Sequence, residues 1–286
     1  MRIAHVRERA VLVTGDALGI DIARASGGRF GPSISGLYAN WPEFSAWAAG
    51  APQGPQVRFA ATDLGPPSPA PRQVFAIGLN YGDHAAEAGL AAPEEPAVFT
   101  KFVSSFTGPV TEVALPAATV DWEVELVVVM GRAATHVRAA DAWRHVAGLT
   151  VGQDLSERRL QHAATPAQFS LAKSYPGFSP TGPFLVTPDE VADPRDLRLG
   201  CTLNGEEVQK GRTSQLLFGV EALVERLSAV TTLYPGDVLF TGTPSGVGAA
   251  RTPPRFLSPG DELVSYVEGI GELRQRFVAG AGKEES

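Results

Sequence analysis

Two acidic residues stand two positions apart in the stretch DWEVELVVVM, residues 121–130. The stretch is rich in β-branched valine and predicts a β-strand, on which side chains two positions apart leave the same face. The carboxylates of Glu123 and Glu125 are therefore expected to point the same way. The apolar run Leu126–Met130 that follows indicates that this strand enters the interior of the protein.

A third acid, Asp154, ends the strand-like segment LTVGQD. Carboxylates that are held close together need a compensating cation, and three of them suit a hard divalent metal such as magnesium, manganese or calcium. Zinc would prefer histidine or cysteine, which the neighbouring sequence lacks. An antiparallel strand with one solvent-exposed face also carries polar residues at alternate positions, so spacing alone leaves the metal site a hypothesis.

His84 and Glu87 form a second group with chemical potential, in the segment YGDHAAEAGL. The segment predicts a short helix, and residues three apart on a helix share a face. A carboxylate beside an imidazole can orient it and increase its basicity, so the pair is a candidate general base. An exposed pair of this spacing on a helix surface is the simpler explanation, and the sequence leaves both open.

Other polar segments are weaker candidates. Lys173 lies in LAKSYPGFSPTGP, which has too many turn-forming residues for a helix, so we expect irregular structure to hold its ammonium group. The loop TGTPSGVG offers hydroxyl and backbone N–H groups that suit an anion such as a carboxylate, but it lacks the lysine of a phosphate-binding loop. The remaining histidines have no partners in sequence and are expected to be structural or exposed: His5, His136, His145 and His162.

A proline-rich segment divides the chain into two parts. Asp63–Arg72 holds four prolines and predicts a linker, with a domain boundary near residue 70. Before it, short β-like runs and one helix near Trp41–Ala49 predict a small N-terminal α/β or β-rich domain, residues 1–70. We expect a catalytic domain over residues 71–280 and a loose tail over 281–286.

The second part reads as many short strands with few helices. Residues 214–231 carry apolar side chains at helical spacing, and the segment 146–161 predicts a strand that runs into a helix at Asp154. We therefore expect a mixed fold, mainly β with some α.

Composition restricts the class of protein. The 286 residues are 44% hydrophobic and 19% charged, as in a globular protein with a core, and the net charge of −7 without a basic block argues against nucleic acid as a partner. Cys201 is the one cysteine, so an internal disulfide is excluded. We see no secretion signal and no apolar run of membrane-spanning length, and we expect a soluble, cytoplasmic protein without a membrane partner.

Seven segments in one order resemble the fumarylacetoacetate hydrolase family, its acylpyruvate hydrolase and 2-hydroxyhepta-2,4-diene-1,7-dioate isomerase-like branch. They are NYGDHAAEAG, VFTKFVSSFTGP, DWEVELVVVMGR, GQDLSERRLQ, AKSYPGFSPTGPF, LYPGDVLFTGTPSGVG and FLSPGDELVSYVEGIGELRQRF. The likeness covers roughly residues 72–278. It implies a β-sandwich roll as the catalytic domain, a bound divalent metal (magnesium or manganese, with calcium as a third choice) and a homodimer.

The resemblance also implies roles for individual residues. It assigns metal binding to Glu123, Glu125 and Asp154, and catalysis to His84, Glu87 and Lys173. It assigns substrate binding to a further set: Tyr81, Lys101, Arg158, Gln161 and Thr243. The chain departs from the family pattern at Arg159, where an acid is common, and at Pro176, where many members have aspartate; both changes put the substrate in doubt.

The activity implied is metal-dependent hydrolysis of a C–C bond in a 2,4-dioxo acid, of the acylpyruvate or fumarylpyruvate type. Isomerisation of a 2-hydroxydienedioate, decarboxylation of a 2-oxo diacid, and dehydration or hydrolysis of a sugar-derived 2-oxo acid use the same head-group chemistry and are alternatives. A family member that binds metal without turnover is the non-enzymatic alternative.

Overall fold

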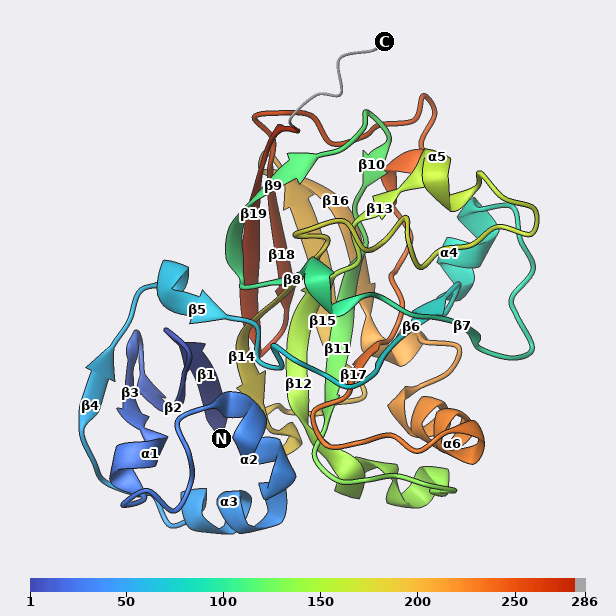
Figure 1. Ribbon diagram of the computed structural model, residues 1–286. Coiled ribbons are helices and arrows are strands. Elements are labelled where there is room, and N and C mark those ends of the chain that lie inside the picture. Colours follow the sequence, from blue (N-terminus) through green and yellow to red (C-terminus); the bar gives the residue numbers. More distant parts are fainter. Residues whose placement is uncertain (281–286) are drawn as a thin grey trace.

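The computed structural model describes residues 1–280, so the tail predicted for 281–286 lies outside the described residues. Within the described part of the chain, no helix is both long enough and apolar enough to cross a membrane. Strands dominate and helices are short, which confirms the predicted mixed fold (Figure 1).

The strands of residues 1–280 form three sheets. In chain order they are β1 (Arg2–Val6), β2 (Arg9–Gly15), β3 (Leu18–Asp21), β4 (Gln56–Arg58), β5 (Leu64–Gly65), β6 (Val74–Gly78), β7 (Ala97–Phe99), β8 (Phe106–Thr107), β9 (Val110–Leu115), β10 (Val120–Asp121), β11 (Val124–Met130), β12 (Val146–Gln153), β13 (Ser156–Glu157), β14 (Ser179–Val186), β15 (Arg198–Leu203), β16 (Glu206–Arg212), β17 (Val238–Phe240), β18 (Glu262–Val267) and β19 (Gly271–Ala279). The helices are α1 (Ile22–Ala25), α2 (Ile34–Ala39), α3 (Trp41–Ala48), α4 (Gly82–Glu87), α5 (Arg158–Gln161) and α6 (Val220–Val230).

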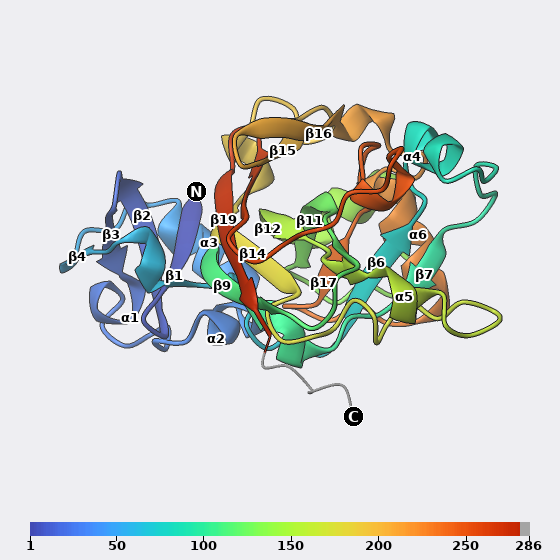
Figure 2. The same ribbon diagram turned by 90° about the horizontal axis from the view of Figure 1, so that it is seen from above.

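The largest sheet runs through the whole molecule. Its order is β4-β3-β2-β1-β14-β12-β11-β17-β6-β7, with β5 added beside β1 and β8 beside β14. A five-stranded sheet has the order β16-β15-β18-β19-β9, and β10 pairs with β13 alone. Figures 1 and 2 place the N-terminal elements at one side of the molecule and α4, α5 and β7 at the opposite side.

Strand β11 is buried on both faces, which explains its apolar run Leu126–Met130. Leu126 and Val128 belong to the core shared with the five-stranded sheet, together with Leu199 of β15. Val127 and Val129 belong to a second core that includes Phe44 of α3. Glu125 lies two positions before Val127, and side chains two positions apart leave the same face of a strand. Its side chain therefore leaves β11 on the face away from the five-stranded sheet.

The N-terminal segment is joined to the rest by backbone pairing as well as by side chains. Strand β1 pairs with β14, where Ile3 lies opposite Leu185. Ile3 and Leu37 share a core with Phe240 of β17. The segment before residue 70 therefore extends the largest sheet and covers one of its faces. The predicted helix near Trp41–Ala49 is α3.

Three local expectations differ from the structure. No helix begins at Asp154: the chain stays extended while Ser156–Glu157 pairs with β10, and the Glu157 side chain then accepts from the N–H groups of Arg159 and Leu160 to start α5. Glu123 does not lie on the same strand as Glu125, because it falls between β10 and β11. Helix α6 begins at Val220, later than the apolar spacing suggested.

Candidate active site and metal centre

The three predicted metal ligands come together at the ends of β11 and β12. Val124 lies opposite Gln153 in the ladder, and the N–H of Asp154 donates to the carbonyl of Glu123 over 2.9 Å. The Gln153 side chain accepts from the Glu123 N–H, which holds the break before β11 in place. As a result, carboxylate oxygens of Glu123, Glu125 and Asp154 all lie within 4.8 Å of one another, and all three residues are buried.

Lysine and arginine side chains compensate part of this buried charge. Lys173 Nζ lies 2.7 Å from both Glu123 Oε2 and Asp154 Oδ2. Arg158 bridges Glu123, at 2.7 Å, and Asp121, at 2.8 Å. Burial alone would raise the pKa of Glu123, but the Lys173 and Arg158 charges lower it to about 2. Burial opposes the charged form of Lys173 too, yet the facing carboxylates of Asp154 and Glu123 raise its pKa.

Glu125 is the least compensated of the three acids. Its Oε2 accepts from the Gly242 N–H at 2.7 Å, but among residues 1–280 it forms no ion pair within 4.0 Å. Burial and the neighbouring carboxylates of Asp154 and Glu123 raise its pKa well above the ordinary value. A cation beside Glu125 would relieve this repulsion.

The donor set fits a hard divalent metal. Every candidate ligand is a carboxylate oxygen, the donor that magnesium, manganese and calcium prefer. The buried Tyr81 hydroxyl has no hydrogen-bond partner in the described chain, and burial together with the charge of Glu125 raises its pKa. An unpaired donor beside an undercompensated acid is the condition expected where a metal with its water shell completes the site.

The His84–Glu87 pair is formed on α4. His84 Nδ1 lies 2.7 Å from Glu87 Oε1, and Glu87 Oε2 accepts from the Gly246 N–H at 2.9 Å. In a neutral imidazole held in this way, Nδ1 carries the proton and Nε2 is free to accept one. The loop after β17 thus fixes the carboxylate that orients the histidine.

The TGTPSGVG loop does bind carboxylates, but they belong to the protein. Its N–H groups reach three acids: Gly242 donates to Glu125, Gly246 to Glu87, and Gly248 to Asp121. The Thr243 hydroxyl donates to the Val124 carbonyl and accepts from Gln209. The loop therefore holds one acid of the triad and the carboxylate of the His84–Glu87 pair in place.

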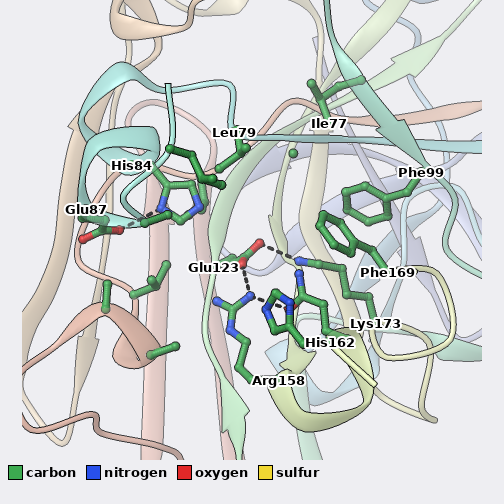
Figure 3. Close-up of a pocket in the computed structure, with 18 residues that line it drawn as sticks. Ile77, Leu79, His84, Glu87, Phe99, Glu123, Arg158, His162, Phe169 and Lys173 are labelled. Atoms are coloured by element: carbon green, nitrogen blue, oxygen red, sulfur yellow. Dashed lines mark hydrogen bonds and ion pairs between the residues drawn. The ribbon is translucent and has the colours of Figure 1, made fainter. Parts of the chain in front are cut away.

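A cavity of about 370 Å³ lies between these groups. Figure 3 shows His84 and Glu87 on one side of Glu123, and Phe99 with Phe169 on the other. The predicted residues that line the cavity are His84, Glu87, Glu123, Arg158, Gln161, Lys173 and Thr243. Arg158 and Gln161 are joined by a hydrogen bond of 2.9 Å, so α5 presents them together.

Two of the predicted substrate-binding residues lie outside the cavity lining. Lys101 is fully buried behind Asp154, where its ammonium contacts Asp154 Oδ1 and the Lys173 carbonyl. Tyr81 is also buried and does not line the cavity. Arg159 and Pro176, the two departures from the family pattern, are exposed and outside the lining, so they do not shape the pocket directly.

Sequence reasoning missed several residues of the site. His162 has no partner nearby in sequence, yet it lines the cavity next to Phe169, with ring centroids 6.5 Å apart. Asp121 anchors Arg158, a role that the sequence did not predict. The position of Asp121 two residues before Glu123 was the only available signal for it.

Comparison with protein families gives a match over residues 73–278 to the model described as fumarylacetoacetate (FAA) hydrolase C-terminal. Among curated proteins, human oxaloacetate tautomerase FAHD2A, mitochondrial, is 47% identical over 214 residues, which are 74% of this chain and 68% of that protein.

Solved structures agree in fold over almost the whole chain. A Mycobacterium smegmatis protein, described as a candidate HpcE protein, has a TM-score of 0.94 and 58% identity, with 98% of this chain and 99% of that chain covered. Maleylpyruvate hydrolase from Sphingobium sp. SYK-6, solved with manganese(II) and pyruvate, has a TM-score of 0.79 and 27% identity, with 98% and 100% covered.

Proposed function

We propose that this chain, which belongs to the fumarylacetoacetate hydrolase family, is a divalent-metal-dependent hydrolase that cleaves a C–C bond of a 2,4-dioxo acid. The cavity is the observation that carries the proposal. Glu123, one member of the buried acid triad, lines it together with the oriented imidazole of His84, and most of the remaining lining is apolar. A dioxo acid has the matching parts: a chelating 2-oxo acid head, a second carbonyl and an acyl group.

Glu123, Glu125 and Asp154 are the residues that would hold the metal, magnesium or manganese before calcium. When bound, the cation would polarise the 2-oxo acid head and favour its enolate form. The oxygen donor set and the undercompensated Glu125 support this assignment. The manganese(II) and pyruvate in the solved maleylpyruvate hydrolase support it from a relative.

His84 is the proposed general base. Its Nε2 takes a proton from water, and the resulting hydroxide adds to the C4 carbonyl of the substrate. The C3–C4 bond then breaks, its electron pair goes to C3, and the imidazolium returns the proton to C3 of the pyruvate enolate. For an acylpyruvate anion and one water, the products are a carboxylate, pyruvate and one proton. Glu87 keeps the imidazole in the required tautomer throughout.

The cations at the cavity floor have a fixed electrostatic role. Lys173 is held by two carboxylates and the Ser156 hydroxyl, so its charge is oriented before substrate arrives. Arg158 and Gln161 line the same region and stay our proposed contacts for the substrate carboxylate, and Thr243 would join them only if its hydroxyl turned away from the Val124 carbonyl.

Keto–enol tautomerisation of a 2-oxo acid is the second candidate. The specific observation in its favour is the curated relative, an oxaloacetate tautomerase at 47% identity. The same groups would serve it, because His84 would take the proton from C3 of the substrate instead of from water. Isomerisation of a hydroxydienedioate, decarboxylation of an oxo diacid and turnover of a sugar-derived acid share this enolate chemistry.

Turnover with defined substrates separates the candidates. The protein is assayed with acetylpyruvate for release of pyruvate, and with oxaloacetate for decay of the enol absorbance, each with Mg²⁺, Mn²⁺, Ca²⁺ or EDTA. Hydrolysis predicts metal-dependent pyruvate release that Glu123→Ala and His84→Ala abolish. The matched control is His136→Asn, at an exposed histidine outside this cavity.

The outcomes are distinct. Metal-dependent enol decay without pyruvate release from acetylpyruvate would replace hydrolysis by tautomerisation. If manganese binds but neither substrate is turned over, isomerisation, decarboxylation, a sugar-derived substrate or a protein that binds metal without turnover would be favoured. We also propose a homodimer, which sedimentation of the purified protein tests directly.

A further inference from the structure

The cavity has two chemically different regions. Except for His162, its ionisable groups gather on one side and at the floor: Glu123, Arg158, Lys173, His84 and Glu87. Most of the remaining lining is apolar and comes from several separate segments: Ile77, Leu79, Leu90, Phe99, Phe169, Val247, Ala249 and Ala250. The cavity volume of about 370 Å³ leaves space beyond what a three-carbon oxo acid head fills.

Phe99 and Phe169 form an aromatic wall opposite His84 (Figure 3). Their ring centroids lie 5.5 Å apart at 71°, an edge-to-face contact. Phe99 is fixed by backbone pairing, because β7 pairs with β6 and sets Phe99 opposite Ala76. Lys173 Nζ lies 5.2 Å from the centre of the Phe99 ring, so the wall begins directly beside the charged floor.

No free cation of the described chain faces this wall. The Arg158 guanidinium is bound by Asp121, Glu123 and Gln161, and the Lys173 ammonium by Glu123 and Asp154. His84 is bound by Glu87 on the far side. His162 is the one remaining ionisable side chain near the aromatic rings. A second substrate carboxylate placed against the wall would lose water without gaining an ion pair with lysine or arginine.

We propose that the Phe99–Phe169 wall determines the substrate class: a 2-oxo acid whose distal substituent is uncharged and apolar, such as an aryl group, and not a second carboxylate. This inference rests on the proposed function, because it assumes that the 2-oxo acid head binds at the acid triad. The substrate proposed for this chain thus differs from oxaloacetate, the diacid in the name of the curated relative, which carries a second carboxylate.

Binding of unreactive analogues tests the wall without relying on turnover. The manganese-loaded protein is titrated in a calorimeter with oxalate, which represents the head alone, with 2-oxo-4-phenylbutanoate and with 2-oxoglutarate. Burial of a phenyl ring predicts that 2-oxo-4-phenylbutanoate binds about 10- to 100-fold more tightly than 2-oxoglutarate. In His162→Gln, 2-oxo-4-phenylbutanoate should still bind more tightly than 2-oxoglutarate, because we expect the His162 imidazole not to bind the distal carboxylate.

Phe169→Ala is the diagnostic variant. It is expected to weaken binding of the phenyl ligand about 10-fold and to leave oxalate binding within about two-fold. Leu171→Ala is the matched control, since Leu171 is 66% exposed on the same segment and does not line the cavity. It should leave all three affinities unchanged.

The two proposals fail in different ways. If oxalate shows no manganese-dependent binding, the head site is wrong and the proposed function fails with the inference. If oxalate binds but 2-oxoglutarate binds as tightly as the phenyl ligand or more tightly, in the wild type or in His162→Gln, only the inference is overturned. Equal loss of oxalate and phenyl binding in Phe169→Ala would also overturn it, because Phe169 would then support the whole site instead of the distal group.

Discussion

The ammonium group of Lys101 lies 2.5 Å from Asp154 Oδ1, and both side chains are fully buried. Lys101 also donates to the carbonyl of Lys173, and burial lowers its pKa. It thus ties together a proposed metal ligand and the backbone of a proposed catalytic residue from behind the cavity. The geometry favours a positioning role over the substrate contact that the family resemblance implies.

Lys101→Met should therefore destabilise the protein. Removing one partner of a buried ion pair costs about 3–5 kcal/mol of unfolding free energy, measured by urea denaturation. Lys210→Met is the control, since the Lys210–Glu207 pair is exposed and should change stability by less than about 1 kcal/mol. Unchanged stability with a raised KM would instead assign Lys101 to substrate binding.

Glu125→Gln should have opposite effects without and with metal. In EDTA it removes a carboxyl group whose ionised form is disfavoured by burial and by the neighbouring carboxylates, while the amide oxygen can still accept from Gly242, so thermal stability should rise. A gain of about 1 kcal/mol corresponds to roughly 2–4 °C in a chain of this size.

In the presence of manganese the wild type should instead be more stable than Glu125→Gln. The wild type gains about 2.7 kcal/mol when the metal concentration is 100 times its Kd, and the variant should gain almost nothing. Melting curves in EDTA and in manganese measure both effects, with the exposed Glu272→Gln as the control. Equal stabilisation of wild type and variant by manganese would remove Glu125 from the metal site.

Glu87→Gln should lower kcat more than it changes KM. The glutamine can accept from either His84 or Gly246 but holds the imidazole less firmly, and loss of a well-placed general base costs about 10²–10⁴-fold in rate. His84→Ala should reach the larger end of that range. Steady-state kinetics on the substrate found by the turnover assay provide the measurement. A change confined to KM would mean that α4 only closes the cavity.

Residue type and spacing indicated the three acids and the His84–Glu87 pair as candidates, and the structure brings each group together, but their roles were implied only by the family resemblance. Residue type and spacing were not enough to find Phe99 and Phe169. An aromatic residue in an apolar run is ordinarily part of a core, and only the pairing of β6 with β7 and the path of the segment after α5 bring these two rings together. Such contacts between distant segments carry no local signal.

The start of α5 could not be predicted for a related reason. Charged and polar residues from Asp154 to Gln161 fit an amphipathic helix by local pattern alone. Two tertiary interactions override that pattern: the lysines that hold the Asp154 carboxylate, and the pairing of β13 with β10. Helix propensity decides the conformation only after Glu157, where a side-chain cap is available.

The Arg9–Asp21 pair should make the stability of the N-terminal segment depend on pH. Asp21 is buried, accepts from Arg9 Nε at 2.7 Å and caps α1 through the Arg24 N–H. The hydrogen bond from Arg9 lowers the Asp21 pKa below its ordinary value of 3.8. Because the native state binds this proton less readily than the unfolded chain, the stabilisation is present above the unfolded pKa and is lost as the pH falls through the native one.

Asp21→Asn should accordingly cost roughly 1 kcal/mol at neutral pH, a modest value because Arg9 is partly exposed and asparagine can still cap the helix. The difference in unfolding free energy between the wild type and Asp21→Asn should become smaller as the pH falls below about 4. Urea denaturation over a series of pH values measures it, with Asp16→Asn in the exposed turn before β3 as the control. A difference that stayed constant down to low pH would show that capping geometry, and not the charge of Asp21, stabilises this segment.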